Sequence, residues 1–202
     1  MFSSCAPALT RLRDPGAVLL VPLLALGCIS GKSPPARTFV LEVAPPQARA
    51  QEAPAAGRPL RFRGVVASKA VDLRQAWRLS PEELWQHELL RWSEPPAETV
   101  ARALGRHLYE GEGLKRSSVL SSPTLEVDLR ALEELREARQ VRVELGVLLL
   151  GEDGVARLER SWSAEAPIGG EEPEDAVRAY DALLGRLLPE IAREVARVLA
   201  QG

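Results

Sequence analysis

The sequence lacks the short motifs that mark the common enzyme classes. It has no Gly-x-Ser-x-Gly nucleophile elbow, no His-Glu-x-x-His zinc motif, no phosphate-binding loop and no Gly-x-Gly-x-x-Gly fingerprint. Its two histidines, His87 and His107, fall in separate segments, and a metal site needs three or four converging ligands. We therefore interpret them as surface or half-buried side chains. We expect no catalytic residue, no metal and no cofactor.

Paired carboxylates are present, but they do not form a recognisable catalytic pair. Glu133 and Glu134 are typical of a solvated face, and the acidic run from Glu171 to Asp175 is typical of a helix start. A glycosidase would need two carboxyl groups that face each other across a substrate. An enzyme whose Glu and Asp residues meet only in the folded chain stays open as a minor alternative.

The chain also has no excess of positive charge. It contains 26 Lys and Arg against 28 Asp and Glu. Removal of residues 1–27 would take away Arg11, Arg13 and Asp14 and leave 24 basic and 27 acidic residues, a net charge of −3. A nucleic-acid-binding domain would have a basic excess on one face, so we expect no nucleic-acid partner.

A short apolar run, Val18 to Cys28, follows the basic residues Arg11 and Arg13. A basic start, an uncharged apolar stretch and a small final residue are typical of a secretory signal peptide. Its end, Leu-Ala-Leu-Gly-Cys, resembles a bacterial lipobox. Gly27 gives the peptidase room at the bond before Cys28, and the Cys28 thiol is the nucleophile that takes the lipid. We predict cleavage between these two residues, with diacylglycerol and an N-acyl chain such as palmitate on Cys28.

The alternative is an ordinary signal peptide or an anchor with a chance cysteine. A spanning helix needs about 20 apolar residues and this run has roughly ten, which argues against an anchor. Cys5 leaves with the signal peptide and a lipidated Cys28 cannot pair, so the mature domain is predicted to have no disulfide. Ile29 follows the cysteine, so the enterobacterial sorting rule predicts the periplasmic face of the outer membrane.

Cleavage would leave 175 residues, enough for one domain with a core. Residues 28–37 contain Ser, Gly and Pro and predict a flexible tether. Residues 38–202 are assigned to a single domain, which begins with a strand over Thr38–Val43. Residues 44–59, with four prolines and many alanines, predict a flexible surface loop.

The next elements are a strand over Leu60–Val66, where apolar residues alternate with arginines, and a weaker extended piece over Val71–Leu79. Ser80-Pro81-Glu82-Glu83 resembles a helix start. The segment from there to Trp92 is either a short helix or an extended bridge. Val100, Leu104 and Leu108 repeat at helical spacing, and Gly111 is expected to be the left-handed cap of that helix.

The most distinctive internal motif is Arg91-Trp92-Ser93-Glu94-Pro95-Pro96. In a structural interpretation, Trp92 fills the corner between sheet and helix, Ser93 or Glu94 caps the helix, and the prolines set its entry. In a functional interpretation, Arg91, Trp92 and Glu94 lie at a partner interface, where Arg and Trp are favoured. The residues alone leave both open, and we favour the structural one.

The second half of the domain alternates strongly. Leu125–Leu129 and Val141–Leu149 have apolar residues at every second position, with a charged turn near Glu133–Arg139 between them. Gly151-Glu-Asp-Gly154 is a hairpin signal, and the return strand places Leu158 and Trp162 on one face. A long helix follows from Pro173, with Pro189 expected to kink it. The order predicts an α+β fold with a mixed, largely antiparallel sheet and two main helices packed on one face.

Taken together, these features resemble the ABC-type transport auxiliary lipoprotein family. The features that carry the resemblance are the lipobox ending at Cys28, the tether into Thr38–Val43, the Arg91-Trp92-Ser93-Glu94-Pro95-Pro96 motif and the strands and helix that follow. The resemblance implies an outer-membrane lipoprotein that works with an MCE-domain protein in lipid transport between two membranes. It implies no catalytic residues. The Ala- and Pro-rich stretch from Pro45 to Pro59 departs from the pattern.

The sequence thus favours a non-enzymatic, lipid-anchored domain that docks an MCE-type ABC lipid transport system. The alternative is a periplasmic carrier that itself holds a lipid or another apolar ligand. A carrier needs a sizeable apolar cavity and a docking domain does not. The partners expected are the MCE-domain protein and the membrane, and self-association stays open.

Overall fold

The computed structural model describes residues 34–46 and 55–201. The predicted signal peptide, the Gly27–Cys28 cleavage site and residues 28–33 of the tether lie outside the described residues. So do residues 47–54 of the predicted loop. The described residues of that loop are partly packed: Ala55 is fully buried, and the amide of Gly57 donates to the carbonyl of Gly113 at 2.8 Å.

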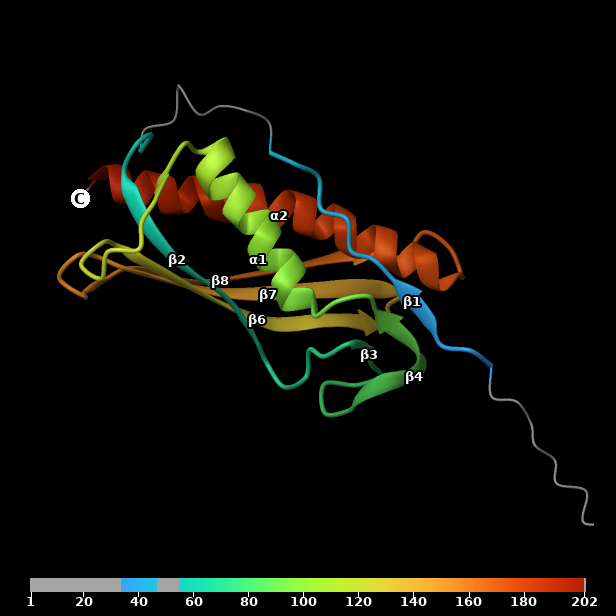
Figure 1. Ribbon diagram of the computed structural model, residues 1–202. Coiled ribbons are helices and arrows are strands. Elements are labelled where there is room, and N and C mark those ends of the chain that lie inside the picture. The colour runs from blue at the N-terminus through green and yellow to red at the C-terminus, as the bar shows by residue number, and fades with distance from the viewer. Residues whose placement is uncertain (1–33, 47–54, 202) are drawn as a thin grey trace, which may run out of the picture. The chain divides into compact units, whose positions relative to one another are not determined.

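The described chain forms eight strands, two α-helices and one π-helical turn (Figure 1). The strands are β1 Arg37–Phe39, β2 Pro59–Ala67, β3 Arg74–Arg78, β4 Leu84–Trp92, β5 Lys115–Arg116, β6 Thr124–Leu135, β7 Gln140–Leu150 and β8 Ala156–Pro167. The helices are α1 Pro96–Arg106 and α2 Pro173–Gln201, and the π-helical turn is His107–Gly111.

All eight strands join one mixed sheet built around β6. The meander β6–β7–β8 is antiparallel, as the alternating pattern predicted. The other edge of β6 is shared by two parallel neighbours: β2 pairs with its first half, and β3 pairs with Glu133–Leu135. Beyond β3 lie β4 and then β1, which runs parallel to β4.

Both α-helices lie on the same face of the sheet, so the predicted fold class is confirmed (Figure 1). Helix α1 packs mainly on β2, and α2 packs on β7 and β8. The apolar side chains of α2 recur with helical spacing and are buried along its length. Examples are Leu184, Leu188, Ile191 and Val195, each with no exposed surface. Pro189 lies inside α2, which continues to Gln201.

The helix start predicted at Ser80–Glu83 is wrong, because these residues form the turn between β3 and β4. The amide of Glu83 donates to the carbonyl of Ser80 at 3.3 Å, and the following residues pair as a strand with β3 and β1. Local capping chemistry favoured a helix here. Pairing on both edges and the stacked rings of Trp77 and Trp85 favour the strand.

The end of α1 also differs from the prediction. Gly111 belongs to the π-helical turn and has no left-handed backbone, whereas Gly113 does, with φ of 65°. If Gly111 were replaced by a residue with a side chain, the new Cβ would lie 3.1 Å from the Cβ of Pro46. Gly111 is therefore used for close packing, and the left-handed residue stands two positions later.

Trp92 lies at the corner between sheet and helices, as the structural interpretation proposed. It is 4% exposed, and its ring meets that of Tyr180 edge to face, with centroids 5.7 Å apart. Its amide donates to the carbonyl of Leu73 at 2.7 Å. Tyr180 is almost fully buried, and burial raises the pKa of its phenol well above the usual value. Trp92 thus joins β4 to α2 in one apolar core.

We expect Trp92→Ala to lower the free energy of unfolding by about 3–5 kcal/mol, because a large cavity would open against Tyr180. Chemical denaturation followed by circular dichroism would measure the loss. Trp85→Ala is the matched control, since Trp85 is 54% exposed, and it should cost less than half as much. Equal costs for the two variants would contradict a core role for Trp92.

Candidate functional site

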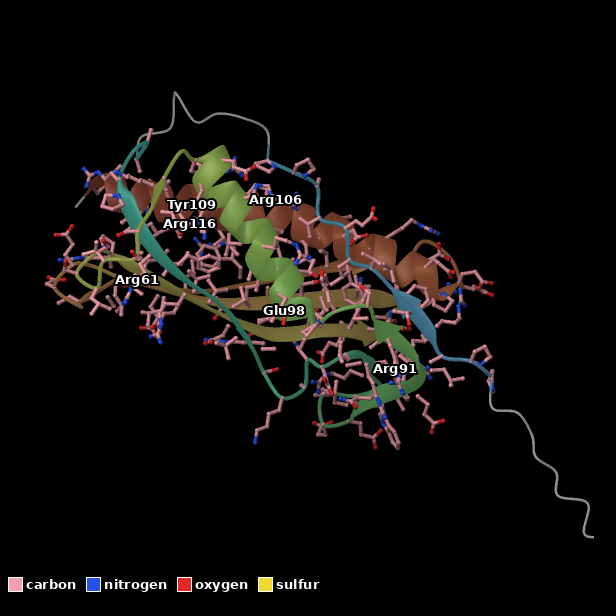
Figure 2. The ribbon with its side chains drawn as sticks, viewed as in Figure 1. Arg61, Arg91, Glu98, Arg106, Tyr109 and Arg116 are labelled. Atoms are coloured by element: carbon pink, nitrogen blue, oxygen red, sulfur yellow. The ribbon has the colours of Figure 1, made fainter. Side chains whose placement is uncertain are left out.

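The motif residues Arg91, Trp92 and Glu94 do not form one site. Trp92 is in the core, whereas Arg91 is exposed on β4, beyond the start of α1 (Figure 2). Glu94 accepts a hydrogen bond from the hydroxyl of Thr99 at 2.6 Å and pairs with Arg102, and these contacts lower its pKa. The predicted side-chain cap is wrong: α1 starts at Pro96 with no side-chain cap bond. Glu94 instead ties the motif to the first two turns of the helix.

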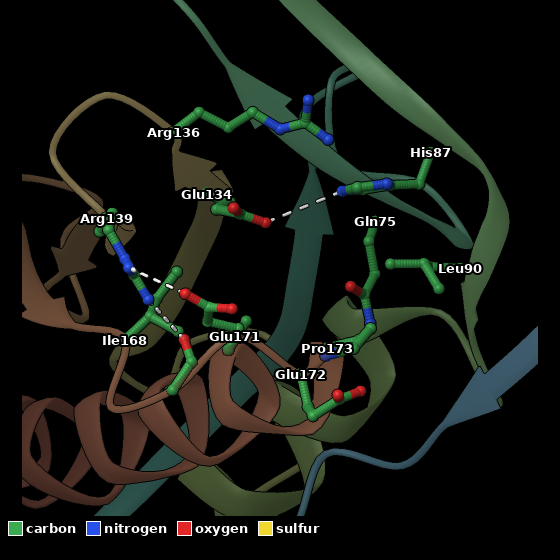
Figure 3. A pocket seen from close by; sticks show the side chains of 12 residues that line it. Gln75, His87, Leu90, Glu134, Arg136, Arg139, Ile168, Glu171, Glu172 and Pro173 are labelled. Carbon is green, nitrogen blue, oxygen red and sulfur yellow. Dashed lines mark hydrogen bonds and ion pairs between the residues drawn. The ribbon is translucent and has the colours of Figure 1, made fainter.

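A cleft of about 360 Å³ lies where β3, β4, the end of β6 and the start of α2 meet (Figure 3). Its lining mixes charged, polar and apolar side chains. They come from five separate places in the chain: Gln75 of β3, His87 and Leu90 of β4, Glu134 of β6, Arg139 of the next turn, and Ile168 to Ala176 at the start of α2. No motif in the sequence indicated this cleft.

Two buried polar atoms beside the cleft have no hydrogen-bond partner in the described structure. Gln75 is 4% exposed and its Nε2 is unpaired. The Nε2 of His87 is also buried without a hydrogen bond, although it lies 3.8 Å from a carboxylate oxygen of Glu134. Unpaired buried donors cost stability, so a group that accepts hydrogen bonds would be favoured here.

Arg139 holds the loop before α2 against the β6–β7 turn. Its backbone is left-handed, with φ of 52°, a conformation in which a non-glycine residue is uncommon. Its side chain explains why a glycine is not used: Nη2 donates to the carbonyl of Gly170 at 2.9 Å, and Nη1 lies 3.7 Å from Glu171. The amide of Ile168 donates to the Arg139 carbonyl at 2.9 Å. These bonds position one wall of the cleft.

The β3–β4 hairpin carries a ring cluster next to this cleft. Trp77 and Trp85 stack with centroids 5.8 Å apart, and the ring of His87 lies 6.3 Å from that of Trp77. The guanidinium of Arg136 lies over Trp77 at 3.7 Å from the ring centroid. Trp85 remains 54% exposed. We call Trp77, Trp85 and Leu79 the hairpin face.

The prediction that Glu133 lies on a solvated face is wrong. Glu133 is 3% exposed and accepts two hydrogen bonds from Arg78, at 3.0 and 3.1 Å. Arg142, which also pairs with Glu144, lies 3.6 Å from Glu133. The long arginine side chains cover the carboxylate from both neighbouring strands. Its neighbour Glu134 points to the other face of the sheet, as alternation requires, and is only partly buried.

The face of β6–β8 opposite the helices is polar, as predicted. Glu159 is exposed there. Arg157 is exposed at the hairpin end of this face, beside the end of α2, and pairs with Asp153 at 2.7 Å. Arg130 crosses β7 and donates to the hydroxyl of Ser161 at 2.7 Å. A side chain at Gly146 would collide with that guanidinium, because its Cβ would lie 2.4 Å from Nη2. Gly146 therefore leaves a shallow charged groove of about 430 Å³ across the three strands.

His107 is buried rather than at the surface, with 6% exposure and an unpaired Nε2. Burial, with the nearby charge of Arg106, lowers its pKa, and a hydrogen bond with the backbone of Ala44 opposes this shift. His107 and His87 are not brought together. Among the described residues no cluster of three or more His, Cys, Asp and Glu could hold a metal ion.

The clefts in the described part of the chain share one property: each has charged side chains in its lining. One of about 660 Å³ lies at the end of α2, where Leu149 and Leu199 meet Arg58 and Arg157. Tyr109 and Arg116 line another, at the opposite end of α1 from Glu98 (Figure 2). The 660 Å³ cleft also has an apolar lining, from Pro59, Leu149, Val198 and Leu199.

Comparison with known proteins bears on this geometry. The model of the family described as ABC-type transport auxiliary lipoprotein component matches residues 39–192. No curated protein matches the chain. Neither helix in residues 34–46 and 55–201 is long and apolar enough to cross a membrane.

Three solved structures have the same fold. Protein XCC0632 from Xanthomonas campestris has a TM-score of 0.70 and 20% identity, covering 82% of this chain and 98% of that one. An uncharacterized protein has a TM-score of 0.64 and 15% identity, covering 80% and 99%. Hypothetical protein CT253 from Chlamydia trachomatis has a TM-score of 0.54 and 10% identity, covering 73% and 100%. At these identities the likeness shows the fold alone.

We expect Glu133→Ala to lower the free energy of unfolding by about 2–3 kcal/mol. This loss is smaller than the loss of stability expected when one partner of a fully buried ion pair is removed, because Arg78 and Arg142 keep some contact with water. Urea denaturation at pH 7 would measure it. Glu137→Ala, in the exposed turn after β6, is the matched control and should change stability by less than about 0.5 kcal/mol. A loss at Glu133 no larger than at Glu137 would contradict the ion-pair role.

His107 should make folding sensitive to mild acid. Its pKa is lowered in the folded state, so below about pH 6.5 the unfolded chain takes up a proton first and stability falls as pH falls. This dependence ends once pH passes the folded pKa. His107→Gln removes this contribution, so between pH 7 and pH 5 the wild-type protein should lose stability relative to the variant as pH falls. Asp181, whose pKa is raised to about 6, gives an opposite slope in both proteins and cancels in the comparison. Identical profiles would contradict the assignment.

Proposed function

This chain belongs to the family of ABC-type transport auxiliary lipoprotein components, and from that membership we propose that it is an outer-membrane-anchored docking component of an MCE-type lipid transport system. Cys28 carries the lipid, and the folded domain faces the periplasm and binds an MCE-domain protein. The domain performs no chemistry of its own. The family match over residues 39–192 carries this proposal.

The way the chain enters the domain supports a tethered role. The first described strand, β1, begins at Arg37, nine residues after Cys28, and pairs with Leu90 to Trp92 of β4. Its Phe39 is buried, as are Leu41 and Val43 in the extended segment that follows. The tether therefore ends in an element held by both hydrogen bonds and core packing, so a pull on the anchor is transmitted to the sheet.

The filled core supports docking over carriage. A carrier would enclose acyl chains in apolar surface, whereas the core between sheet and helices is filled by large side chains such as Leu104, Leu145 and Leu188. The polar face of β6–β8 offers the surface that docking needs. Its charges lie on strands whose other face is core, so they are held in fixed positions and give a partner a defined pattern.

We expect charge reversal on this face, in Arg157→Glu or Glu159→Arg, to weaken capture of the MCE-domain protein by at least about tenfold at low salt. The effect should shrink as salt rises, because exposed charges are screened. Arg186→Glu is the matched control: it makes the same charge change on the exposed side of α2. Binding of the full-length proteins by surface plasmon resonance at two salt concentrations would measure it.

A second experiment tests the lipid anchor at Cys28. Cys28→Ala should leave the protein outside the outer-membrane fraction and abolish its effect in a membrane-integrity assay. Unmodified Cys28 in the mature protein, found by mass spectrometry, would refute the anchoring. If the purified protein instead extracts phospholipid stoichiometrically and binds no MCE-domain protein, the docking proposal is wrong and the carrier replaces it.

A further inference from the structure

The hairpin face exposes more apolar surface than its fold requires. Trp85 is 54% exposed and Leu79, at the start of the hairpin turn, is 43% exposed. An indole gains much from burial, so an exposed one that is also held in place indicates a contact surface. Trp85 is held by stacking on Trp77, which in turn lies under Arg136. The cluster keeps the indole at the surface instead of leaving it free to fold back.

The lipid anchor joins the domain beside this face. Arg37 pairs with Leu90 on β4, the strand that carries Trp85. Nine residues separate Cys28 from Arg37, and a fully extended chain of that length reaches at most about 30 Å. The chain that follows Cys28 therefore enters the domain at β1, next to β4, whereas Leu120, which is also exposed, lies in the loop before β6.

The charges of the hairpin indicate which surface it suits. From Arg74 to Trp92 there are three arginines, and they are balanced by Glu82, Glu83 and Glu88, while Arg136 over Trp77 adds one positive charge. A nearly neutral cluster with two glutamates at its turn has little attraction to a strongly anionic surface. Indoles, by contrast, prefer the headgroup region of any bilayer, because the ring is apolar and its N–H is polar.

We propose that the hairpin face lies in the headgroup region of the bilayer that holds the lipidated Cys28, with zwitterionic phospholipid as its contact. This inference rests on the proposed lipid anchor and adds a second, non-covalent contact to it. Two contacts, one at Cys28 and one at Trp85, fix which side of the domain faces the membrane. The polar face of β6–β8 is then presented in one orientation to a partner in the periplasm.

The test uses the full-length lipoprotein, expressed with its own signal sequence and reconstituted into phosphatidylcholine vesicles. Some vesicles carry a nitroxide quencher near the headgroup and others carry it near the end of the acyl chain. The headgroup quencher should dim tryptophan emission at least about twofold more than the deep one, as expected for an interfacial indole. Trp85→Phe should remove most of this quenching, because Trp92 and Trp162 are each only 4% exposed and Trp77 lies between Arg136 and the neighbouring ring of the hairpin.

Matched variants separate insertion from mere proximity. Leu79→Ser keeps the fluorophore but should reduce quenching of Trp85 by at least about half, whereas Leu120→Ser, at the other end of β6, should leave it unchanged. Equal quenching in wild type and Leu79→Ser would overturn the membrane contact.

The remaining outcomes tell the two proposals apart. Mass analysis that finds lipid on Cys28, together with no shallow quenching of Trp85, overturns this inference alone and leaves the docking function standing. Absence of lipid on Cys28 overturns both. If Trp85 of the wild-type protein shows no headgroup quenching and Trp85→Ser abolishes capture of the MCE-domain protein, the hairpin face is a protein interface and the membrane contact is wrong.

Discussion

The pairing of strand β6 is the constraint on which the rest of the structure depends. One of its edges pairs with β7 along nearly its whole length, whereas the other is divided between β2 and β3. A strand edge can form one ladder at each residue, so β2 and β3 cannot both continue and must separate. The sheet therefore branches. Helix α1 packs on the β2 branch (Figure 1), and the β3–β4 branch exposes the ring of Trp85.

A projecting branch needs its own support, and the two faces supply it differently. On the polar face, the Arg78–Glu133–Arg142 ion pairs join β3, β6 and β7. On the helix face, Trp92 and Tyr180 join β4 to α2 through apolar contact. The ion pairs stabilise the branch through directional electrostatic contacts, whereas Trp92 and Tyr180 stabilise it by burying apolar surface. Because both act within a few residues of the hairpin, an exposed indole can be held there without local unfolding.

The sequence predicted the elements whose periodicity is strong. Strands β7 and β8, the first half of β6 and both helices follow from alternation or helical spacing, since burial on one face enforces that period. The charged turn predicted from Glu133 begins too early, because β6 continues to Leu135. Residues 80–92 were ambiguous, because a local helix-start pattern competed with pairing to strands that are distant in the sequence, and such pairing leaves no local signal. The burial of Glu133 was missed for the same reason: its partner Arg78 stands 55 residues away.

The cleft at the start of α2 could not be found from sequence either, because its lining comes from five short segments that share no motif. By contrast, the core is specified by apolar residues at regular spacing, and this pattern does not constrain which residues occupy the polar face. This explains how chains only 10–20% identical keep the same sheet and helices. Under the docking proposal, the charges on β6–β8 contact the partner, whereas the strands that follow the tether belong to the other branch. The proposed docking surface and those strands are thus separated across one strand, β6.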